Sequence, residues 1–166
     1  MTNNSSVQWH AAPWSRLLIG VSASVSVLCL GLGIGFITSG VPTLAWASVV
    51  PLLLVAGSAL FTIRGYTVTP EALLVHRLLW KTRVPLTGLQ SARIEPDAMR
   101  WSLRLFGNGG LFSFSGWYRN KALGTYRAWV TDPGRTVVLR YGTKTVVVSP
   151  SEPEAFVVAV VRGGNS

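Results

Sequence analysis

The sequence predicts a mainly β domain of the α+β class, closed by one C-terminal helix and preceded by a hairpin of two membrane-spanning helices. Two observations indicate this. Residues 17–63 contain no Asp, Glu, Lys or Arg, although the 166-residue chain carries 15 Lys and Arg. From Arg64 onward the pattern changes to short apolar runs separated by Gly, Pro, Asn and Asp, which is typical of an antiparallel sheet. The chain therefore divides into residues 1–16, 17–63 and 64–166.

Two uncharged runs, residues 17–37 and 44–63, form the predicted membrane hairpin. At about 1.5 Å per residue, each is long enough to cross the roughly 30 Å hydrocarbon core of a bilayer as a helix. The short segment between them contains Gly and Pro, so it predicts a tight turn. Gly31 and Gly35 let the first helix approach another backbone closely, and packing against the second helix is favoured over dimerisation. We expect Pro51 to kink the second helix.

Cations flank the hairpin but do not lie inside it. Arg16 precedes the first helix and Arg64 follows the second, whereas the connecting turn has no Lys or Arg. Because Lys and Arg concentrate on the cytoplasmic side, we expect a multi-pass inner (plasma) membrane protein with a cytoplasmic N-terminal tail and a cytoplasmic C-terminal domain. A signal peptide cleaved after Ala45-Trp46-Ala47 is disfavoured, because the apolar run is too long and a second one would follow the cut.

The C-terminal part contains seven candidate strands and a closing eighth, followed by a helix. The helix is predicted because Ser151 and Glu154 have the spacing of a capping box and Pro153 would lie in the first turn. Antiparallel strands finished by one helix favour a strongly bent sheet or a partly open barrel whose end or seam the helix plugs. The candidate strands are residues 65–69, 72–78, 82–86, 90–94, 111–115, 125–131, 136–142 and 145–149.

Motifs for catalysis or metal binding are missing from the sequence. It has no nucleophile elbow, P-loop or metalloprotease motif. His10 lies in the N-terminal tail, and His76 lies in a predicted strand, where we expect it to face solvent. The single cysteine, Cys29, has no partner for a disulfide. We therefore expect no catalytic residues, no cofactor, no metal and no enzymatic activity.

Aromatic and basic residues alternate with glycines between residues 107 and 132. Alternation places Phe112 and Phe114 on one face of a strand, and it separates Tyr126 from Arg127 in the next. Residues 116–124, bounded by glycines, are interpreted as a wet, basic and aromatic loop. We expect this loop to be the main surface of contact.

Two stretches carry a family resemblance, YTVTPEALLVHRLLWKTRVPLTGLQSARI (66–94) and RLFGNGGLFSFSGWYRNKALGTYRAWVTDPGRTVVLRYGTKTVVVSPSEPEAFV (104–157). Their spaced glycines and the Thr131-Asp132 pair before a turn are the most specific features. The pattern resembles the bacterial pleckstrin-homology-like (PH) domains, particularly members in which a membrane hairpin precedes the domain. The resemblance implies about seven strands in a strongly bent sheet capped by a C-terminal helix. Such folds bind lipids, peptides and proteins alike, so the ligand stays open.

Cations gather at three places in the C-terminal part: the second hairpin, the segment before the glycines, and the aromatic loop. Each cation held near an anionic leaflet is worth about 1 kcal/mol, and the domain begins directly after the second helix. Trp80 and Trp117 suit an interfacial position. A solvated basic surface that only sets topology is the alternative for any single cation. The candidate lipid or partner contacts are Trp117, Tyr118, Arg119, Lys121, Arg127, Arg77, Lys81 and Arg83, with Arg100 and Arg104 nearby.

We therefore expect a non-enzymatic protein that binds a partner protein or acidic lipid headgroups at the cytoplasmic membrane surface. The alternative is a structural subunit of a membrane assembly, which self-associates through an open sheet edge or through the apolar helix 155–161. The expected partners are membrane lipids, another protein or a second copy of the chain. Nucleic acid is not expected despite the pI of ≈ 10.9, because no nucleic-acid module is present.

Overall fold

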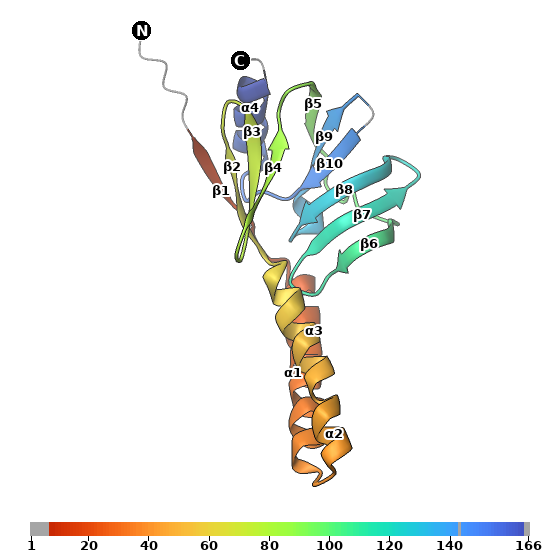
Figure 1. Cartoon of the computed structure of the whole chain (residues 1–166). Helices are drawn as coiled ribbons and strands as arrows, with labels where there is room; N and C mark the ends of the chain where they lie inside the picture. Colours follow the sequence, from red (N-terminus) through yellow and green to blue (C-terminus); the bar gives the residue numbers. More distant parts are fainter. Residues whose placement is uncertain (1–6, 143, 165–166) are drawn as a thin grey trace.

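The computed structural model describes residues 7–142 and 144–164, and it shows a pair of apolar helices beneath a β domain (Figure 1). The chain begins with strand β1 (Gln8–Ala11), which leads into helix α1 (Arg16–Thr38). The return helix consists of α2 (Pro42–Ala47) and α3 (Val49–Leu60). The domain then continues with β2 (Ile63–Val68), β3 (Ala72–Arg77), β4 (Lys81–Pro85), β5 (Leu89–Ile94), β6 (Leu103–Gly109), β7 (Phe114–Asn120), β8 (Gly124–Val130), β9 (Val137–Tyr141), β10 (Lys144–Val148) and helix α4 (Pro153–Gly164).

Both helices of the pair are long and apolar enough to cross a membrane. The Arg16–Thr38 helix has 23 residues and a mean hydropathy of 2.3, and Pro42–Leu60 has 19 residues and a mean hydropathy of 1.9. Ser15 begins the first helix, because its Oγ accepts a hydrogen bond from the Leu18 amide. Most side chains of the pair lie exposed rather than in a protein core. These properties indicate membrane anchoring.

The second helix is broken at Ser48, not kinked at Pro51. Pro51 has no amide hydrogen for the carbonyl of Ala47, and in a continuous helix its ring would clash with that carbonyl. The helix restarts at Val49, which places the proline in the first turn of α3, where it is tolerated. Pro51 therefore interrupts the helix at Ser48, about one turn before the proline itself.

A different glycine from those expected packs against the second helix. A Cβ atom added to Gly33 would lie 3.3 Å from the side chain of Leu52. At Gly31 and Gly35, no described residue comes within 4 Å of such an atom. The expectation that these two glycines face the second helix is therefore wrong.

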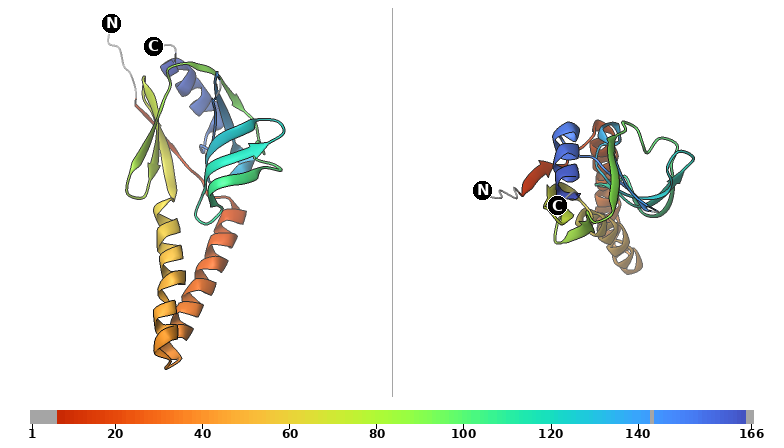
Figure 2. Two further views of the ribbon diagram at one scale, coloured as in Figure 1. Left: turned by 45° about the vertical axis from the view of Figure 1, so that its right-hand side comes forward. Right: turned by 90° about the horizontal axis from the view of Figure 1, so that it is seen from above.

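The strands form two sheets. One contains β1-β2-β3-β4, and the other contains β5-β9-β10-β8-β7-β6. Neighbouring strands run antiparallel, but β10 and β8 run parallel. Helix α4 contacts β2 of one sheet and β5 of the other, so it closes the seam between them, which Figure 2 shows from two directions. The predicted closure of the sheet by a C-terminal helix is confirmed.

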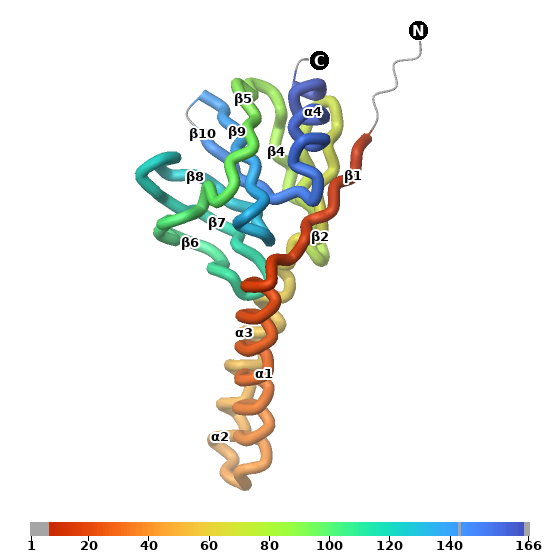
Figure 3. The backbone as a smooth tube through the Cα atoms, turned by 180° about the vertical axis from the view of Figure 1, so that it is seen from behind, coloured from red at the N-terminus to blue at the C-terminus, as the bar shows by residue number. Residues whose placement is uncertain are grey.

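The N-terminal segment, expected to be a separate tail, contributes a strand to the domain. Gln8 pairs with Val68 and Ala11 pairs with Gly65, and Figure 3 shows β1 running from this position into α1. Because β1 precedes the helix pair and β2 follows it, both outer ends of the pair lie on the same side. The Trp9 ring packs on His76 with a centroid distance of 4.8 Å. His76 is thus half-buried, and its expected exposure to solvent is wrong.

The strand expected at residues 111–115 and the loop expected at 116–124 are both wrong. Residues 114–120 form β7, which pairs with the unpredicted strand β6. Gly107 and Gly116 lie opposite each other in these two strands. A Cβ at Gly116 would lie 2.1 Å from the Phe106 carbonyl oxygen, so glycine here permits close approach of two strands instead of ending one. Phe112, expected in a strand, lies in the connecting turn with φ 64°.

The other predicted strands are confirmed to within two residues at each end. The main core lies between the sheets and α4 and includes Tyr66, Leu73, Leu139 and Phe156, all fully buried. A second cluster covers the other face of the larger sheet around Tyr126. The fold therefore consists of two sheets with a C-terminal helix packed on them, and both sheets lie above the helix pair (Figure 1).

Candidate functional site

A pocket of about 520 Å³ lies between the two sheets, directly above α3. The end of α3 forms its floor through Leu54, Gly57 and Phe61. Strand β3 contributes one wall, and strands β6, β7 and β8 contribute the other. The pocket thus joins the apolar helix pair to the interior of the domain.

Strand alternation turns Arg127 toward this pocket. In β8, Tyr126 and Ala128 are buried in the second core cluster on the opposite face of the sheet. The Arg127 guanidinium lies 5.5 Å from the ring centroid of Trp117, its partner in β7, and 5.0 Å from the ring of Trp129. Aromatic faces therefore hold this cation from two sides.

Arg77 enters the pocket from the other sheet. It ends β3, and its amide donates to the Trp80 carbonyl at 2.9 Å in the tight turn that leads to β4. Its guanidinium lies 5.3 Å from the ring centroid of Phe61 and 5.5 Å from that of Trp80. The side chain is only 9% exposed. A helix end and a turn thus bury Arg77 between two aromatic rings.

Within the part of the chain that the structure describes, neither arginine has an acidic partner. The ion pairs there are Arg83–Glu71 and Arg135–Asp132, with N–O distances of 2.9 and 3.6 Å. The buried Nε atoms of Arg77 and Arg127 have no hydrogen-bond partner among the described residues. Burial, and then the charge of Arg127, lower the pKa of Arg77. Because an arginine stays charged even so, the pocket holds uncompensated positive charge.

The predicted contact residues divide into several groups. Arg77, Trp117 and Arg127 line the pocket together, and Arg104 joins them. Tyr118 is only 4% exposed, and its hydroxyl donates to the Asn108 carbonyl at 2.5 Å, so it belongs to the core and not to a contact surface.

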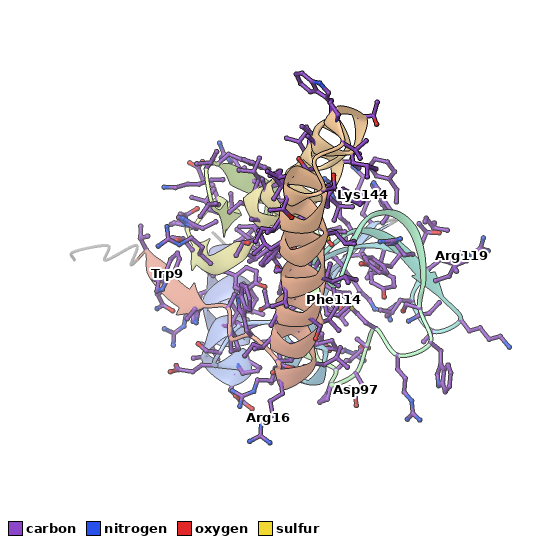
Figure 4. The ribbon with its side chains drawn as sticks, turned by 90° about the horizontal axis from the view of Figure 1, so that it is seen from below. Trp9, Arg16, Asp97, Phe114, Arg119 and Lys144 are labelled. Carbon is purple, nitrogen blue, oxygen red and sulfur yellow. The ribbon has the colours of Figure 1, made fainter. Side chains whose placement is uncertain are left out.

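The remaining predicted cations lie apart from the pocket. Arg119 and Lys121 stand at the far end of the β7–β8 hairpin. Figure 4, which views the molecule from below, shows Arg119 at the outer edge of the β domain, away from the helices. Lys81 and Arg83 lie in β4, where Arg83 pairs with Glu71 on the surface. The eight candidates therefore do not form one surface.

The tip between β6 and β7 fastens the domain to the helix pair. The Phe112 amide donates to Ser22 Oγ in α1, and Ser113 Oγ donates to the Phe61 carbonyl at the end of α3, both at 2.9 Å. Trp14 also contacts the Phe112 ring, with a centroid distance of 6.2 Å. Figure 2 shows the helices apart at this end and close together at the other. Hydrogen bonds thus connect both α1 and the end of the pocket floor to the larger sheet.

The sequence pattern does not predict that the second helix forms the floor of the pocket. Residues 44–63 are predicted only as a membrane span, although Gly57 and Ser58 are small residues near the end of this span. Small residues leave room beside a helix, and this was the available signal. In residues 7–142 and 144–164, no group of three or more His, Cys, Asp or Glu could hold a metal ion.

Comparison with known protein families identifies a match for the β domain. The family model of the bacterial PH domain matches residues 64–163, which is more than half of the chain and runs from β2 into α4. No curated protein matches the chain. No solved structure matches it either.

Proposed function

The chain belongs to the bacterial PH domain family, and from that premise we propose that it is a non-enzymatic protein of the inner (plasma) membrane whose cytoplasmic PH domain binds the headgroup of an acidic lipid. The binding site is the pocket around Arg77 and Arg127. The main support is this pair of arginines, whose buried Nε atoms have no hydrogen-bond partner and which have no acidic partner in the described chain.

An anion between the two arginines supplies the partner that each lacks. Leaving a charge buried and unpaired costs several kcal/mol, about 3–5 kcal/mol when one partner of a buried pair is removed. A phosphate accepts charge-assisted and often bidentate hydrogen bonds from guanidinium groups. Burial, and then repulsion from Arg127, lower the pKa of Arg77, and the negative charge of a phosphate offsets that repulsion. A phosphate-bearing headgroup therefore fits the chemistry of the pocket.

The floor of the pocket favours a lipid over a free anion. Leu54 and Gly57 belong to the second apolar helix, which is long enough to cross a membrane. A phosphate held above them leaves acyl chains free to run along α3. One molecule thus satisfies both the charged wall and the apolar floor.

The orientation follows from the flanking cations. Arg16 and Arg64 adjoin the ends of the helix pair, and the turn between the helices has no Lys or Arg. This bias supports a cytoplasmic location of the domain. The inner leaflet that it faces is the one that carries anionic lipid.

A structural subunit that self-associates is the second candidate. In α4, Phe156 and Val160 are fully buried against the sheets, while Val158 and Val161 are 49% and 41% exposed. Val158 and Val161 form an exposed apolar strip on α4. This strip offers less surface for self-association than the whole apolar helix 155–161 would. A protein partner on the same strip is the third candidate.

The test compares two charge-matched variants of the full-length protein in zwitterionic detergent. Native mass spectrometry would count phosphatidylglycerol and phosphatidylcholine molecules retained by the wild type, R77Q/R127Q and R119Q/K121Q. We expect the wild type and R119Q/K121Q to prefer phosphatidylglycerol and R77Q/R127Q to lose that preference by about tenfold, since a hydrogen bond to a charged group contributes about 1.5–3 kcal/mol. Equal losses in both variants, or no loss in R77Q/R127Q, would contradict the proposal.

A further inference from the structure

We propose that the domain is seated on the bilayer surface by two apolar rims that flank the pocket. The first, called the strand rim, consists of Trp101, Leu103, Leu105 and Phe106 on and beside β6. The second, called the turn rim, consists of Leu78, Leu79 and Trp80 between β3 and β4. The proposal rests on the membrane anchoring in the proposed function, and it is independent of which headgroup the pocket binds.

The strand rim consists of large apolar side chains, yet these side chains are highly exposed. Trp101 is 87% exposed, Leu103 68%, Leu105 49% and Phe106 76%. Strand β6 is the edge of its sheet, with β7 on one side only. Edge strands in water are normally blunted by charges or prolines, because an apolar edge promotes aggregation. An exposed apolar patch of this kind marks a contact with a membrane or another molecule.

The attachment of the β6–β7 tip to the helix pair favours a membrane over another molecule as the contact of the strand rim. Phe112 and Ser113 bond to Ser22 of α1 and to Phe61 at the end of α3. Figure 1 and the left view of Figure 2 both show β6 as the strand of its sheet nearest the helix pair. Strand β6 therefore extends to one side of the helix pair, next to the ends of the helices. In a bilayer, these helix ends lie at the level of the lipid headgroups.

The turn rim lies at the same level on the opposite side of the pocket. Leu79 is 73% exposed, Leu78 44% and Trp80 39%. The Trp80 ring contacts Phe61, the residue that follows the second helix, edge-on with a centroid distance of 5.5 Å. Tryptophan at this depth suits the interface between headgroups and acyl chains. A bilayer covers both rims at once, whereas a second copy paired along β6 leaves the turn rim in water.

Cations accompany the strand rim. Arg100 lies with its guanidinium 5.7 Å from the Trp101 ring. Arg104 stands between Leu103 and Leu105 in the sequence, and it lines the adjoining pocket. Asp97 is the nearest acid in the sequence, and it lies in the segment that precedes Trp101. Aromatic and aliphatic side chains interleaved with arginine are typical of surfaces that rest in the headgroup region.

The experiment places an environment-sensitive fluorophore at single cysteines in full-length protein that carries C29S. The labelled variants are L103C for the strand rim, L79C for the turn rim, and K144C, at the start of β10, as the control away from both rims. Each is reconstituted into phosphatidylcholine vesicles with and without spin-labelled quencher lipid. We expect quenching at L103C and L79C to exceed that at K144C at least threefold.

The outcomes separate this proposal from the proposed function. A label at L53C, in the second helix, reports the anchoring itself, and its lack of quenching would contradict membrane insertion. Quenching at L53C without quenching at L103C would overturn the seating, and emission at L103C that depends on protein density would assign the strand rim to a second copy. In R77Q/R127Q, we expect quenching at L103C to be unchanged, because the rims do not need the pocket.

Discussion

The hydroxyl of Tyr66 donates a hydrogen bond of 2.6 Å to the backbone carbonyl of Trp129, and this bond joins the two sheets. The same hydroxyl accepts a hydrogen bond of 3.1 Å from the amide of Ser149. Burial raises the pKa of Tyr66 to about 12, so the phenol remains a neutral donor at physiological pH. One fully buried side chain thus connects β2 to the strand that carries Arg127.

Tyr66→Phe is expected to lower the free energy of unfolding by about 1–3 kcal/mol, because it leaves a buried carbonyl and a buried amide unpaired. The matched control is Tyr141→Phe. The Tyr141 hydroxyl is buried without a hydrogen-bond partner in the described chain, so its removal leaves stability unchanged or raises it. Denaturant unfolding of the full-length variants in detergent measures both changes. Similar losses in the two variants would show that the bond between the sheets contributes little.

Gly116→Ala is expected to separate β6 from β7. The added Cβ would lie 2.1 Å from the Phe106 carbonyl oxygen, and the backbone φ of 147° is one that glycine adopts readily. We expect a loss of at least about 1–3 kcal/mol from backbone strain and weaker lipid retention, since Trp117 and Phe106 line the pocket.

The control for that change is Gly134→Ala. Its Cβ would lie 3.4 Å from Asp132 Oδ1, which is an ordinary contact, so stability is expected to stay within about 0.5 kcal/mol. Thermal unfolding and lipid retention are measured on both variants. A Gly116→Ala protein as stable as Gly134→Ala would contradict the close approach of the two strands.

Ser22→Ala is expected to release the β6–β7 tip from α1. It removes the acceptor for the Phe112 amide, a bond worth about 0.5–1.5 kcal/mol, so exchange of that amide accelerates by up to about tenfold. Hydrogen exchange read by mass spectrometry over residues 108–115 follows the change. Ser24→Ala alters an exposed serine of the same helix, and we expect no effect. Equal exchange in the two variants would exclude a role for this bond in fastening the tip.

Acid is expected to loosen β1. Burial lowers the pKa of His10 below its ordinary value of 6.5, and the charge of Glu152 offsets part of that effect. The ring lies against Phe156 with a centroid distance of 5.2 Å. Because the folded state favours neutral imidazole, this contribution to stability is present above about pH 6.5 and is lost as the pH falls through the lowered pKa.

His76 adds to the same dependence. Burial, and then the charges of Lys81 and Arg64, lower its pKa, and its Nε2 hydrogen-bonds Thr67 Oγ1 at 2.8 Å. We expect the urea midpoint of the wild type to fall between pH 7 and pH 5, and the midpoint of H10Q/H76Q to fall less. A variant with the full pH dependence of the wild type would assign the effect to other groups.

Composition and alternation predicted the elements whose partners are near in sequence. The two charge-free runs predicted the apolar helices, and alternation in β8 assigned Tyr126 and Arg127 to opposite faces correctly. Strand β1 escaped prediction because it is short and its partner β2 lies on the far side of the helix pair. Strands β6 and β7 were not predicted correctly, because a glycine that lets two strands approach each other cannot be distinguished in the sequence from a glycine that ends a strand.

The site was predictable only in part, for a similar reason. Arg77, Trp117 and Arg127 were expected to be contact residues, and they do meet in one pocket. The burial of Arg77 depends on Phe61, which is brought there by the packing of the helix end against the β3–β4 turn. Arg119 and Lys121 follow Trp117 closely in the sequence, but the extended strand carries them toward the β7–β8 turn and out of the pocket.

Because β1 and β2 lie on either side of the helix pair in the sequence, the complete smaller sheet can form only if both helices enter the bilayer. Strand β1 is synthesised before the first apolar helix, and its partner β2 is synthesised after the second. If only one of the two helices enters the bilayer, β1 and β2 are left in different compartments and the smaller sheet lacks its outer strand. Trp9 then no longer covers His76, and the misinserted chain presents an open edge of β2 to cellular quality control.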